Sequence, residues 1–351
     1  MIGSRTMRVR HLVLAALSLC ACLAVNADDA PLQTLAGQIA DGDHKGVTGM
    51  MVSMHGRVAA EVYAPGKGPD TRHDIRSATK SITALLIGIL RDGGRLKGIK
   101  TRFDDILPDS FAHMSPDDAR RDLHLVDALT MRTGLACDDW SPASLGHEDK
   151  MYKTKDWGRF LLSQPLAYEI GRHFSYCTGG VVLLGRVIET LSGEPVPEFA
   201  EARLFAPLGI DGARWEKTPA GHTDTGGHLR LSLGALHRIG QLVLAEGRWQ
   251  DRTIVSADWV ETMLKERTRV PGRGSTYGYL WWRNTIPHNG RTYETVYAHG
   301  NGGTFIFVLP EAGIVAAFTG TNFNNAKRQF QPAEWLYSTI VPALVGKQDQ
   351  P

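Results

Sequence analysis

Ser77 and Lys80 are the two side chains of this sequence best suited to covalent chemistry, because they stand three residues apart in Ser77-Ala78-Thr79-Lys80. On a helix this spacing places both side chains on one face, one turn apart. Apolar residues at positions 75, 82, 85, 86, 89 and 90 predict a helix that is buried on almost all sides. A buried lysine must lose its charge or find partners, and a partly neutral lysine can deprotonate a serine hydroxyl. The pattern predicts a nucleophilic serine; the alternative is a helix-capping serine beside a lysine that reaches solvent.

A second candidate group lies in residues 173–180, a loop that follows Gly171 and enters the next predicted helix. Its Tyr176 could bring a phenol oxygen to the Ser77 hydroxyl and exchange a proton with it, provided that a nearby cation lowers the pKa of the phenol. Lys80 is the candidate for that cation. The alternative is an ordinary hydrogen-bonded tyrosine of the core.

A third candidate group is the glycine-rich stretch 298–303, which comes just before a predicted β-hairpin. Its three glycines would allow the backbone to approach another group closely. An edge strand here would point a backbone N–H into the cleft, where it could stabilise an oxyanion together with the N–H of Ser77. The alternative is a glycine-rich turn without a catalytic role.

Taken together, the order and setting of these segments resemble the superfamily of serine β-lactamases, DD-peptidases and esterases. Within it, the chain is most similar to the class C β-lactamase-related serine hydrolases, the group that includes 6-aminohexanoate-dimer hydrolases and β-lactamase-fold esterases. The resemblance covers about residues 40–340. The supporting stretches are residues 174–176, 179–180, 183–185, 204–210, 300–303 and 308–311.

The resemblance implies a role for each candidate residue. Ser77 becomes the nucleophile, Lys80 its general base or proton relay, and Tyr176 the group that passes the proton to the leaving group and later activates water. The backbone N–H groups of Ser77 and Asn301 would form the oxyanion hole. Further substrate-binding positions would be His299, Gly300 and Thr178.

Two positions depart from the pattern of the family. Thr178 stands where the turn usually reads Tyr-x-Asn, and a threonine can still bond the lysine or the substrate, with shorter reach. Ala298-His299-Gly300 aligns with the Lys-Thr-Gly of true β-lactamases, which removes the cation expected to hold a β-lactam carboxylate. Losing such a charge-assisted contact costs on the order of 1.5–3 kcal/mol. The departures therefore favour an ester or small-amide substrate over a β-lactam.

The elements that must position these residues are strands at the two ends of the chain and helices between them. Residues 47–54 and 58–63 predict one β-hairpin, and residues 304–309 and 314–319 predict another. Helices are predicted at residues 77–91, 126–132, 156–163, 179–191 and 233–245. We expect an α+β fold of β-lactamase/transpeptidase type, with an antiparallel sheet formed by the N- and C-terminal segments and flanked by helices. A mainly helical lobe, at about residues 100–235, would border the cleft.

The N-terminus predicts export. Three arginines at positions 5, 8 and 10 precede an apolar run at 12–25, which is too short to span a bilayer, and Val25-Asn26-Ala27 offers a cleavage site. We expect a signal peptide at 1–27, a single domain at 28–351, and a periplasmic or secreted protein. The alternatives are a buried N-terminal helix and a lipoprotein anchored at Cys22, since residues 19–22 loosely resemble a lipobox.

Removal of the leader would leave two cysteines, Cys137 and Cys177. Two cysteines in an oxidising compartment tend to pair, so we predict a disulfide between them. The alternative is two separate buried thiols.

Composition and the remaining motifs exclude several classes of function. A net charge of +2 without a basic run beyond the N-terminus argues against nucleic-acid binding. His147-Glu148 is not a zinc-protease motif because position 151 is Met, and no other histidine has metal-ligand spacing. Residues 226–230 form a glycine turn without the context of a nucleotide-binding loop. No Gly-x-Ser-x-Gly elbow is present. We expect no metal, no cofactor and no transmembrane span.

The sequence thus predicts a serine hydrolase of carboxylesterase or amidase type that acts on a small-molecule ester or amide through a Ser77 acyl-enzyme. Three alternatives remain. One is a weak β-lactamase or D-peptidase acting on cell-wall material, and another is a catalytically inactive binding protein that keeps the fold. The third is an unrelated exported binding protein. Adjacent Trp281 and Trp282 would face opposite ways on a strand, so that one could line the cleft.

Overall fold

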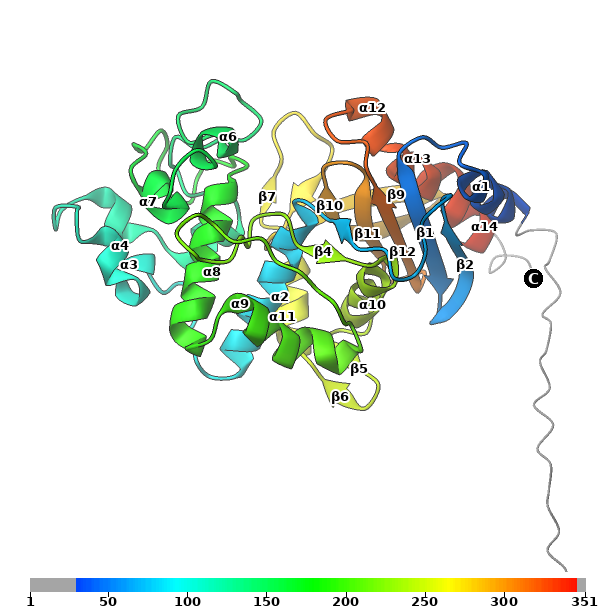
Figure 1. Ribbon diagram of the computed structural model, residues 1–351, viewed down its shortest axis with the longest axis horizontal. Helices are drawn as coiled ribbons and strands as arrows, with labels where there is room; N and C mark the ends of the chain where they lie inside the picture. The colour runs from blue at the N-terminus through cyan, green and yellow to red at the C-terminus, as the bar shows by residue number, and fades with distance from the viewer. Residues whose placement is uncertain (1–29, 346–351) are drawn as a thin grey trace, which may run out of the picture.

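A computed structural model describes residues 30–345, in which a twisted antiparallel sheet at one end meets a helical lobe at the other (Figure 1). This confirms the predicted α+β architecture. The predicted signal peptide and Cys22 lie outside the described residues. Within those residues, no helix combines the length and the apolar character needed to cross a membrane.

The main sheet has eight strands in the order β2-β1-β12-β11-β10-β9-β8-β7. The N-terminal strand β1 pairs with the C-terminal strand β12, with Met50 opposite Phe318, so that the two ends of the chain share one sheet. The strands are β1 (Val47–Met54), β2 (Arg57–Tyr63), β7 (Thr268–Arg269), β8 (Thr276–Tyr277), β9 (Trp282–His288), β10 (Arg291–Gly300), β11 (Thr304–Leu309) and β12 (Ile314–Gly320). Two small ladders are β3 (His73–Asp74) with β4 (Arg230–Leu231) and β5 (Arg248–Trp249) with β6 (Arg252–Thr253).

Helices cover both faces of this sheet. One face packs against the first helix and the C-terminal helices, which share a core cluster with Phe305 and Phe318. These helices are α1 (Ala30–Asp41), α13 (Gln331–Trp335), the π-helical turn η5 (Leu336–Ile340) and α14 (Val341–Val345), and the short α12 (Ala326–Gln329) precedes α13. The other face packs against α2 (Ala78–Asp92) and α10 (Leu233–Leu244), with α11 (Ala257–Leu264) beside α2. Because both faces are covered, the central strands β11 and β12 are buried at every residue.

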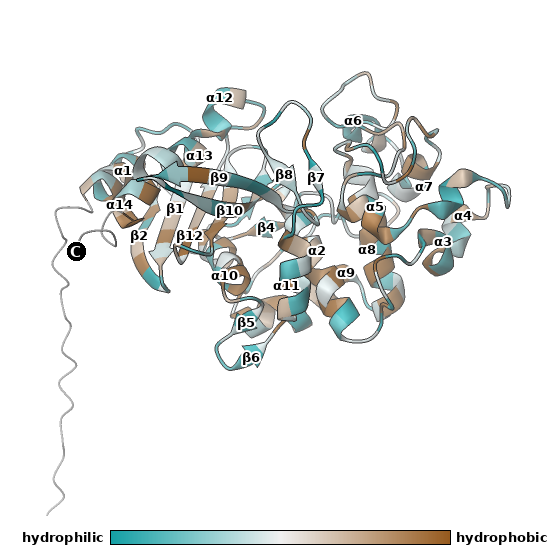
Figure 2. Cartoon of the chain, turned by 180° about the vertical axis from the view of Figure 1, so that it is seen from behind, coloured by the Kyte–Doolittle hydropathy of each residue, from teal (hydrophilic) through white to brown (hydrophobic). Residues whose placement is uncertain are grey.

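The helical lobe is built around one long apolar helix, α8, which Figure 2 shows from behind with hydrophobic colouring along most of its length. Its helices are α3 (Phe103–Ile106), α4 (Pro108–Phe111), α5 (Leu125–Leu129), α6 (Glu148–Met151), α7 (Trp157–Leu162), α8 (Thr178–Ser192) and α9 (Val196–Ala200). α8 ends at Gly193 in the left-handed conformation, a geometry that glycine adopts without strain. The loops that lead into α6 and α8 carry the residues of the candidate site.

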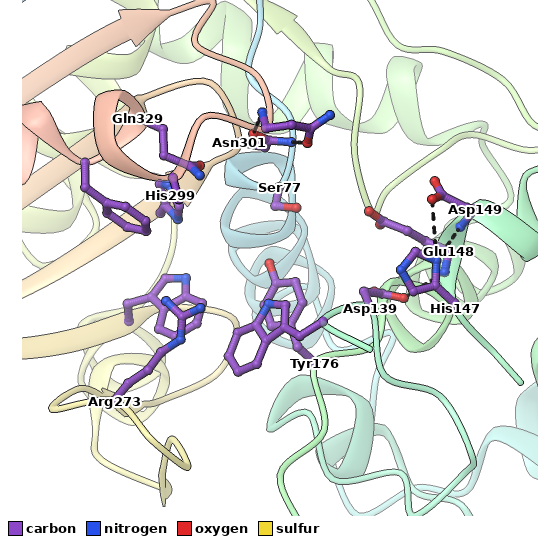
Figure 3. Close-up of a pocket in the computed structure, with 15 residues that line it drawn as sticks. Ser77, Asp139, His147, Glu148, Asp149, Tyr176, Arg273, His299, Asn301 and Gln329 are labelled. Carbon is purple, nitrogen blue, oxygen red and sulfur yellow. Dashed lines mark hydrogen bonds and ion pairs between the residues drawn. The ribbon is translucent and has the colours of Figure 1, made fainter. Parts of the chain in front are cut away.

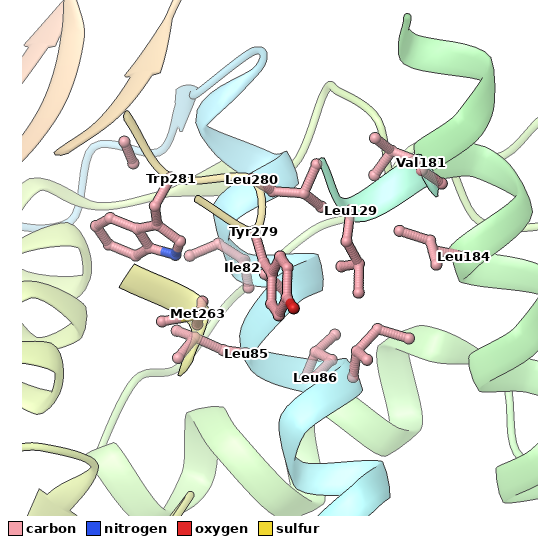
Figure 4. Packing of buried hydrophobic residues seen from close by; sticks show 14 of the residues in the cluster. Ile82, Leu85, Leu86, Leu129, Val181, Leu184, Met263, Tyr279, Leu280 and Trp281 are labelled. Atoms are coloured by element: carbon pink, nitrogen blue, oxygen red, sulfur yellow. The ribbon is translucent and has the colours of Figure 1, made fainter. Parts of the chain in front are cut away.

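Helix α2 joins the sheet to the helical lobe, and this position explains its apolar sequence. Every residue from Ala78 to Leu90 is buried. Figure 4 shows Ile82, Leu85 and Leu86 packed between two sets of neighbours. On one side these are residues of the lobe, Leu129, Val181 and Leu184, and on the other Met263, Tyr279, Leu280 and Trp281. The prediction of a helix buried on almost all sides is confirmed.

Most predicted elements match the structure to within one residue, and two expectations are wrong. The helix expected at 126–132 ends at Leu129, because Met131 has a φ of 57° that a right-handed helix does not allow. The glycine-bearing strand β10 is not an edge strand, since it lies between β9 and β11. Its pairing with β9 stops at Tyr297, however, so that its last three residues are paired on one side alone.

Candidate active site

Ser77 stands at the N-terminus of α2, where it occupies the N-cap position. The residue before it, Arg76, has a φ of 50°, a strained conformation for a non-glycine residue. Arg76 is held there by Asp74, which accepts from its backbone N–H at 3.0 Å, and by His228, which accepts from its guanidinium at 2.8 Å. The side chain of Ser77 makes no capping bond, and its backbone N–H donates to no acceptor among the described residues. Both groups are therefore available to a substrate.

Lys80 lies one turn below Ser77 and contacts it directly. Its Nζ donates to Ser77 Oγ at 3.1 Å and to the carbonyl of Gly226 at 2.6 Å, and the side chain is 1% exposed. Burial lowers the pKa of Lys80, but the charges of Tyr176, Glu148, Asp139 and Asp224 together raise it above its ordinary value. The direction of this shift runs against the expectation of a partly neutral lysine, because Tyr176 and the carboxylates around the ammonium favour its charged form.

Tyr176 lies in the loop that enters α8, and its phenol faces Ser77 across the floor of the site (Figure 3). Burial raises the pKa of Tyr176, and the opposing effects of Lys80 and of a hydrogen bond with Ser77 do not bring it back to its ordinary value. Lys80 Nζ lies 5.2 Å from the centre of the tyrosine ring. The ring is stacked on Trp140, with centroids 5.3 Å apart and planes 7° from parallel. Three of the predicted residues, Ser77, Lys80 and Tyr176, are thus brought together.

The structure contains the predicted disulfide between Cys137 and Cys177, which are 40 residues apart in sequence. Cys177 directly follows Tyr176, and the backbone N–H of Asp139, two residues after Cys137, donates to the carbonyl of Tyr176 at 2.8 Å. The disulfide therefore holds the loop that carries Asp139 against the loop that carries Tyr176.

Replacing Cys137 by serine should destabilise the protein by about 2–4 kcal/mol, because the unfolded chain loses a cross-link that closes a long loop. The measurement is thermal unfolding of the variant and of the wild type, each with and without a reductant. Reductant should lower the melting temperature of the wild type alone. A Cys137→Ala/Cys177→Ala double variant separates loss of the cross-link from exposure of a lone thiol. Equal melting temperatures for all samples would count against a stabilising disulfide.

Thr178, expected to bind the lysine or the substrate, is fully buried and bonds two carboxylates instead. Its hydroxyl donates to Glu148 at 2.6 Å and its backbone N–H to Asp139 at 2.6 Å. Asp139 also accepts from the backbone N–H of Glu148 at 2.9 Å. Burial and the neighbouring Glu148 raise the pKa of Asp139 to about 6, while the charge of Lys80 acts in the opposite direction. Thr178 thus positions acids near Lys80 rather than substrate.

A second acidic group near Lys80 is Asp224, which comes just before the glycine turn at residues 226–230 and acts on the lysine through its charge. Asp224 is 0% exposed and accepts from the backbone N–H groups of Gly226 and Gly227, each at 3.0 Å. The same carboxylate bonds the Nδ1 of His228 at 2.8 Å. These bonds fix the turn so that the carbonyl of Gly226 meets the ammonium of Lys80. The turn therefore has a function at the site that the sequence did not indicate.

Gly300 brings the end of β10 against the start of α2. A Cβ at this position would lie 2.0 Å from the carbonyl oxygen of Ile75, so only glycine fits. The next residue, Asn301, lies beside Ser77 in Figure 3. Its side chain is engaged by Asn324 through bonds of 2.7 and 2.9 Å, whereas its backbone N–H donates to no acceptor in the part of the chain that the structure describes.

Ala298 stands in the place where true β-lactamases carry a lysine, and the next residue, His299, is a neutral side chain. The ring of His299 is stacked on Phe305, with centroids 4.4 Å apart, and lies 5.0 Å from Phe330. Burial, with a smaller effect of the Arg273 charge, lowers the pKa of His299 to about 3. The stretch 298–300 therefore supplies no cation to the site at neutral pH.

Ser77 opens into a pocket of about 550 Å³ between the helical lobe and the end of the sheet. Figure 3 shows its residues: Glu148, Asp149 and Asp139 lie on one side of Ser77, and Arg273 and His299 lie on the other. Trp282, the first residue of β9, lines this pocket, while Trp281, just before the strand, is fully buried in the core. A smaller hollow of about 150 Å³ on the other side of Ser77 is bordered by Arg76 and His228.

Four groups of the site were not expected from the sequence: Asp139, Glu148, the Asp224–Gly226 turn and Arg273. In the sequence, Glu148 stands out only as part of His147-Glu148, which lacks the spacing of a zinc-protease motif. No local pattern marks these residues, because they come from separate loops that tertiary packing brings together. Among the described residues, no cluster of three or more His, Cys, Asp or Glu side chains is placed to hold a metal ion.

A family model and curated relatives both match this chain. Residues 33–336 match the family model described as Beta-lactamase. The 6-aminohexanoate-dimer hydrolase of Paenarthrobacter ureafaciens is 26% identical over 244 residues, which cover 64% of this chain and 61% of that protein. Penicillin-binding protein 4 of Amycolatopsis lactamdurans is 29% identical over 140 residues, which cover 38% of this chain and 33% of that protein. The chain therefore spans less than two thirds of the length of either relative.

The fold is also that of solved structures. EstCE1, a hydrolase with promiscuous acyltransferase activity, superposes with a TM-score of 0.70 at 17% identity, covering 87% of this chain and 98% of EstCE1. At this identity the likeness shows the fold alone.

Proposed function

Because this chain belongs to the beta-lactamase family of serine hydrolases, we propose that it cleaves an ester or amide bond of a small molecule through a covalent acyl-enzyme on Ser77. One observation carries the proposal: the Ser77 hydroxyl, which makes no capping bond, accepts a hydrogen bond from a buried lysine at 3.1 Å, faces a buried phenol and opens into a pocket. A serine flanked by two proton-transfer groups is the arrangement that nucleophilic catalysis requires.

In the acylation step, Ser77 Oγ attacks the carbonyl carbon of the substrate while its proton passes to the pair formed by Lys80 and Tyr176. The carbonyl oxygen becomes an oxyanion, for which the N–H groups of Ser77 and Asn301 are the candidate donors. The bond to the leaving group then breaks, and Tyr176 returns the proton to the departing oxygen or nitrogen. The product of this step is an ester between the acyl group and Ser77.

In the deacylation step, a water molecule attacks the same carbonyl carbon and loses its proton to Tyr176. The bond to Ser77 Oγ breaks, the serine recovers its proton through Lys80, and a carboxylic acid leaves. The raised pKa values of Lys80 and Tyr176 mean that both groups hold their protons at neutral pH. One proton must leave the pair before Ser77 can be deprotonated, so activity should increase with pH above neutrality.

An ester or small amide suits the pocket better than a β-lactam, because the strand position that holds a cation in true β-lactamases is Ala298 here, and the adjacent His299 is neutral. We also propose that the protein is exported. The basic and apolar leader supports this location, and a disulfide fits an oxidising compartment. Cleavage after Ala27 is the proposed processing, with a lipid on Cys22 as its alternative.

The test is the intact mass of the purified mature protein before and after incubation with a fluorophosphonate. We expect a single phosphonyl adduct, which peptide mapping places on the peptide that contains Ser77. The mass of the untreated protein also reports whether the chain begins at Asp28 or carries a lipid. Absence of an adduct on a well-folded protein would favour a binding protein that keeps the fold without catalysis. A panel of esters, anilides, nitrocefin and D-Ala-D-Ala peptides then separates esterase or amidase activity from β-lactamase or D-peptidase activity.

A further inference from the structure

The two sides of the pocket differ in charge. Asp139, Glu148 and Asp149 line the side formed by the helical lobe. Arg273, from the loop between β7 and β8, lines the opposite side and is the one lysine or arginine among the described residues that border the pocket. Figure 3 shows Ser77 between the two groups. A substrate that lies across Ser77 therefore meets negative potential at one end and positive potential at the other.

The charge of Arg273 is not neutralised by an acidic partner among residues 30–345. Its side chain forms no ion pair and no hydrogen bond with the described residues. Its guanidinium lies 4.3 Å from the ring centre of Trp140, which is itself 41% exposed. Stacking on an indole fixes a guanidinium while leaving its N–H groups free to bind. These free donors match the planar geometry of a carboxylate.

Stacked aromatic rings connect Ser77 to Arg273. Tyr176, which faces Ser77, is stacked on Trp140, and both rings lie against Trp282 at centroid distances of 5.8 and 6.2 Å. The rings of Trp282 and Tyr297 are nearly parallel and 6.1 Å apart. The hydroxyl of Ser275, in the same loop as Arg273, bonds the hydroxyl of Tyr297 at 3.1 Å. The loop that carries Arg273 thus contacts a row of aromatic rings that extends from Ser77 to Arg273.

The loop itself gives no structural reason for an arginine. Gly272 and Gly274 flank Arg273, and a Cβ at either position would meet no atom within 4 Å. The guanidinium therefore extends from an open loop onto the pocket wall, where its packing contact is with Trp140.

We propose that Arg273 binds a carboxylate of the substrate, so that the preferred substrates are esters or amides with an apolar chain that ends in an anionic group. This inference rests on the proposed function, since it assigns the substrate class of the same site. The carboxylate can belong to the acyl portion or to the leaving group. In either position it would lie at the Arg273 end of the pocket, because the opposite end carries three carboxylates.

The test compares charged and neutral substrates of equal size. One pair is the p-nitrophenyl monoester of adipic acid and p-nitrophenyl hexanoate, which places the carboxylate in the acyl portion. The other pair is the hexanoate esters of 4-hydroxyphenylacetic acid and of 4-hydroxyphenylacetamide, which places it in the leaving group. For each pair the measured quantity is the ratio of kcat/KM for the charged ester to kcat/KM for the neutral ester.

In one of the two pairs, Arg273→Gln should lower this ratio by about tenfold or more, the effect expected for loss of a charge-assisted hydrogen bond. Arg273→Lys should retain part of the preference. Arg269→Gln removes an equal charge from β7, outside the pocket, and should leave the ratio at its wild-type value. The pair that responds shows which portion carries the carboxylate. Ratios that Arg273→Gln leaves unchanged in both pairs would overturn the proposal.

Binding supplies a second readout that does not depend on turnover. In a Ser77→Ala background, isothermal titration should show that Arg273→Gln weakens binding of the charged ester by about tenfold more than binding of the neutral ester. An equal effect on both esters would overturn the proposal even if the wild type hydrolyses them. Failure of the proposed function is read separately, as the absence of a fluorophosphonate adduct on Ser77.

Discussion

Replacing Lys80 by methionine is expected to slow acylation of Ser77 by about a thousandfold, within the range that proton-transfer groups contribute to catalysis. The ammonium of Lys80 is the cation nearest to Ser77 Oγ, at 3.1 Å, and it is the proposed acceptor or relay for the serine proton. Without it, the charges of Asp139, Glu148 and Asp224 would be uncompensated and would oppose formation of an alkoxide at Ser77. The measurement is the second-order rate constant for labelling by a fluorophosphonate, followed by mass.

The variant should remain folded, because methionine is unbranched and nearly fills the space of the lysine stem. Thermal unfolding checks this, and Lys97→Met, at an exposed lysine, is the matched control. Labelling by a folded Lys80→Met protein at the wild-type rate would contradict the assigned role. If Lys80→Met loses both labelling and the folded state, the labelling rate is measured instead on a Lys80→Arg variant, which keeps the buried charge.

The sequence predicted the sheet and the buried helix well, since both depend on local patterns. Residues 47–54 and 314–319 are predominantly apolar, and the structure buries most of them between two layers of helices. The short strands β7 and β8 could not be predicted in this way. Each has two residues, too few for an alternating pattern, and they form because the chain beside β9 completes the ladder.

The candidate site likewise contains residues that a local pattern predicts and residues that only tertiary packing brings together. Ser77 and Lys80 share a helix, so that their spacing alone predicts their contact. Glu148 acts on Lys80 through its charge, and the loop at 136–149 that carries it is held by the disulfide and by the bond from Thr178. Arg273 lies almost two hundred residues from Ser77 in sequence, and its position depends on the order of strands in the sheet. Contacts of this kind have no signature within a single sequence.

The replacement of asparagine by threonine at Thr178 illustrates how such contacts change an interpretation. From the sequence, it appeared as a weakened version of the family turn with shorter reach. In the structure its hydroxyl and its backbone N–H hold two carboxylates near the lysine, and these carboxylates add to the effect of Tyr176 in raising the pKa of Lys80. The loop at 136–149 therefore contributes to holding the Lys80 charge, and under the proposed mechanism we expect Tyr176 to carry more of the proton transfer.

Replacing Tyr176 by phenylalanine should lower kcat by about a hundredfold for a p-nitrophenyl ester and by more for an anilide of the same acid. The phenol would return a proton to the leaving group, which an aniline nitrogen needs and a p-nitrophenolate does not. The ring should stay in its stack with Trp140 and Trp282, so that the fold and the pocket wall are kept. The measurement is kcat for both substrates as a function of pH.

The pH profile separates this role from a packing role. Because the pKa values of Lys80 and Tyr176 are both raised, wild-type activity should increase as the pH rises above neutrality and one proton leaves the pair. In Tyr176→Phe this increase in activity should depend on Lys80 alone, so it should occur at a different pH. Tyr337→Phe, whose hydroxyl bonds Thr285 far from the site, is the matched control. A Tyr176→Phe protein that loses equal activity on both substrates, with an unchanged pH profile, would show that the phenol supports the pocket without transferring a proton.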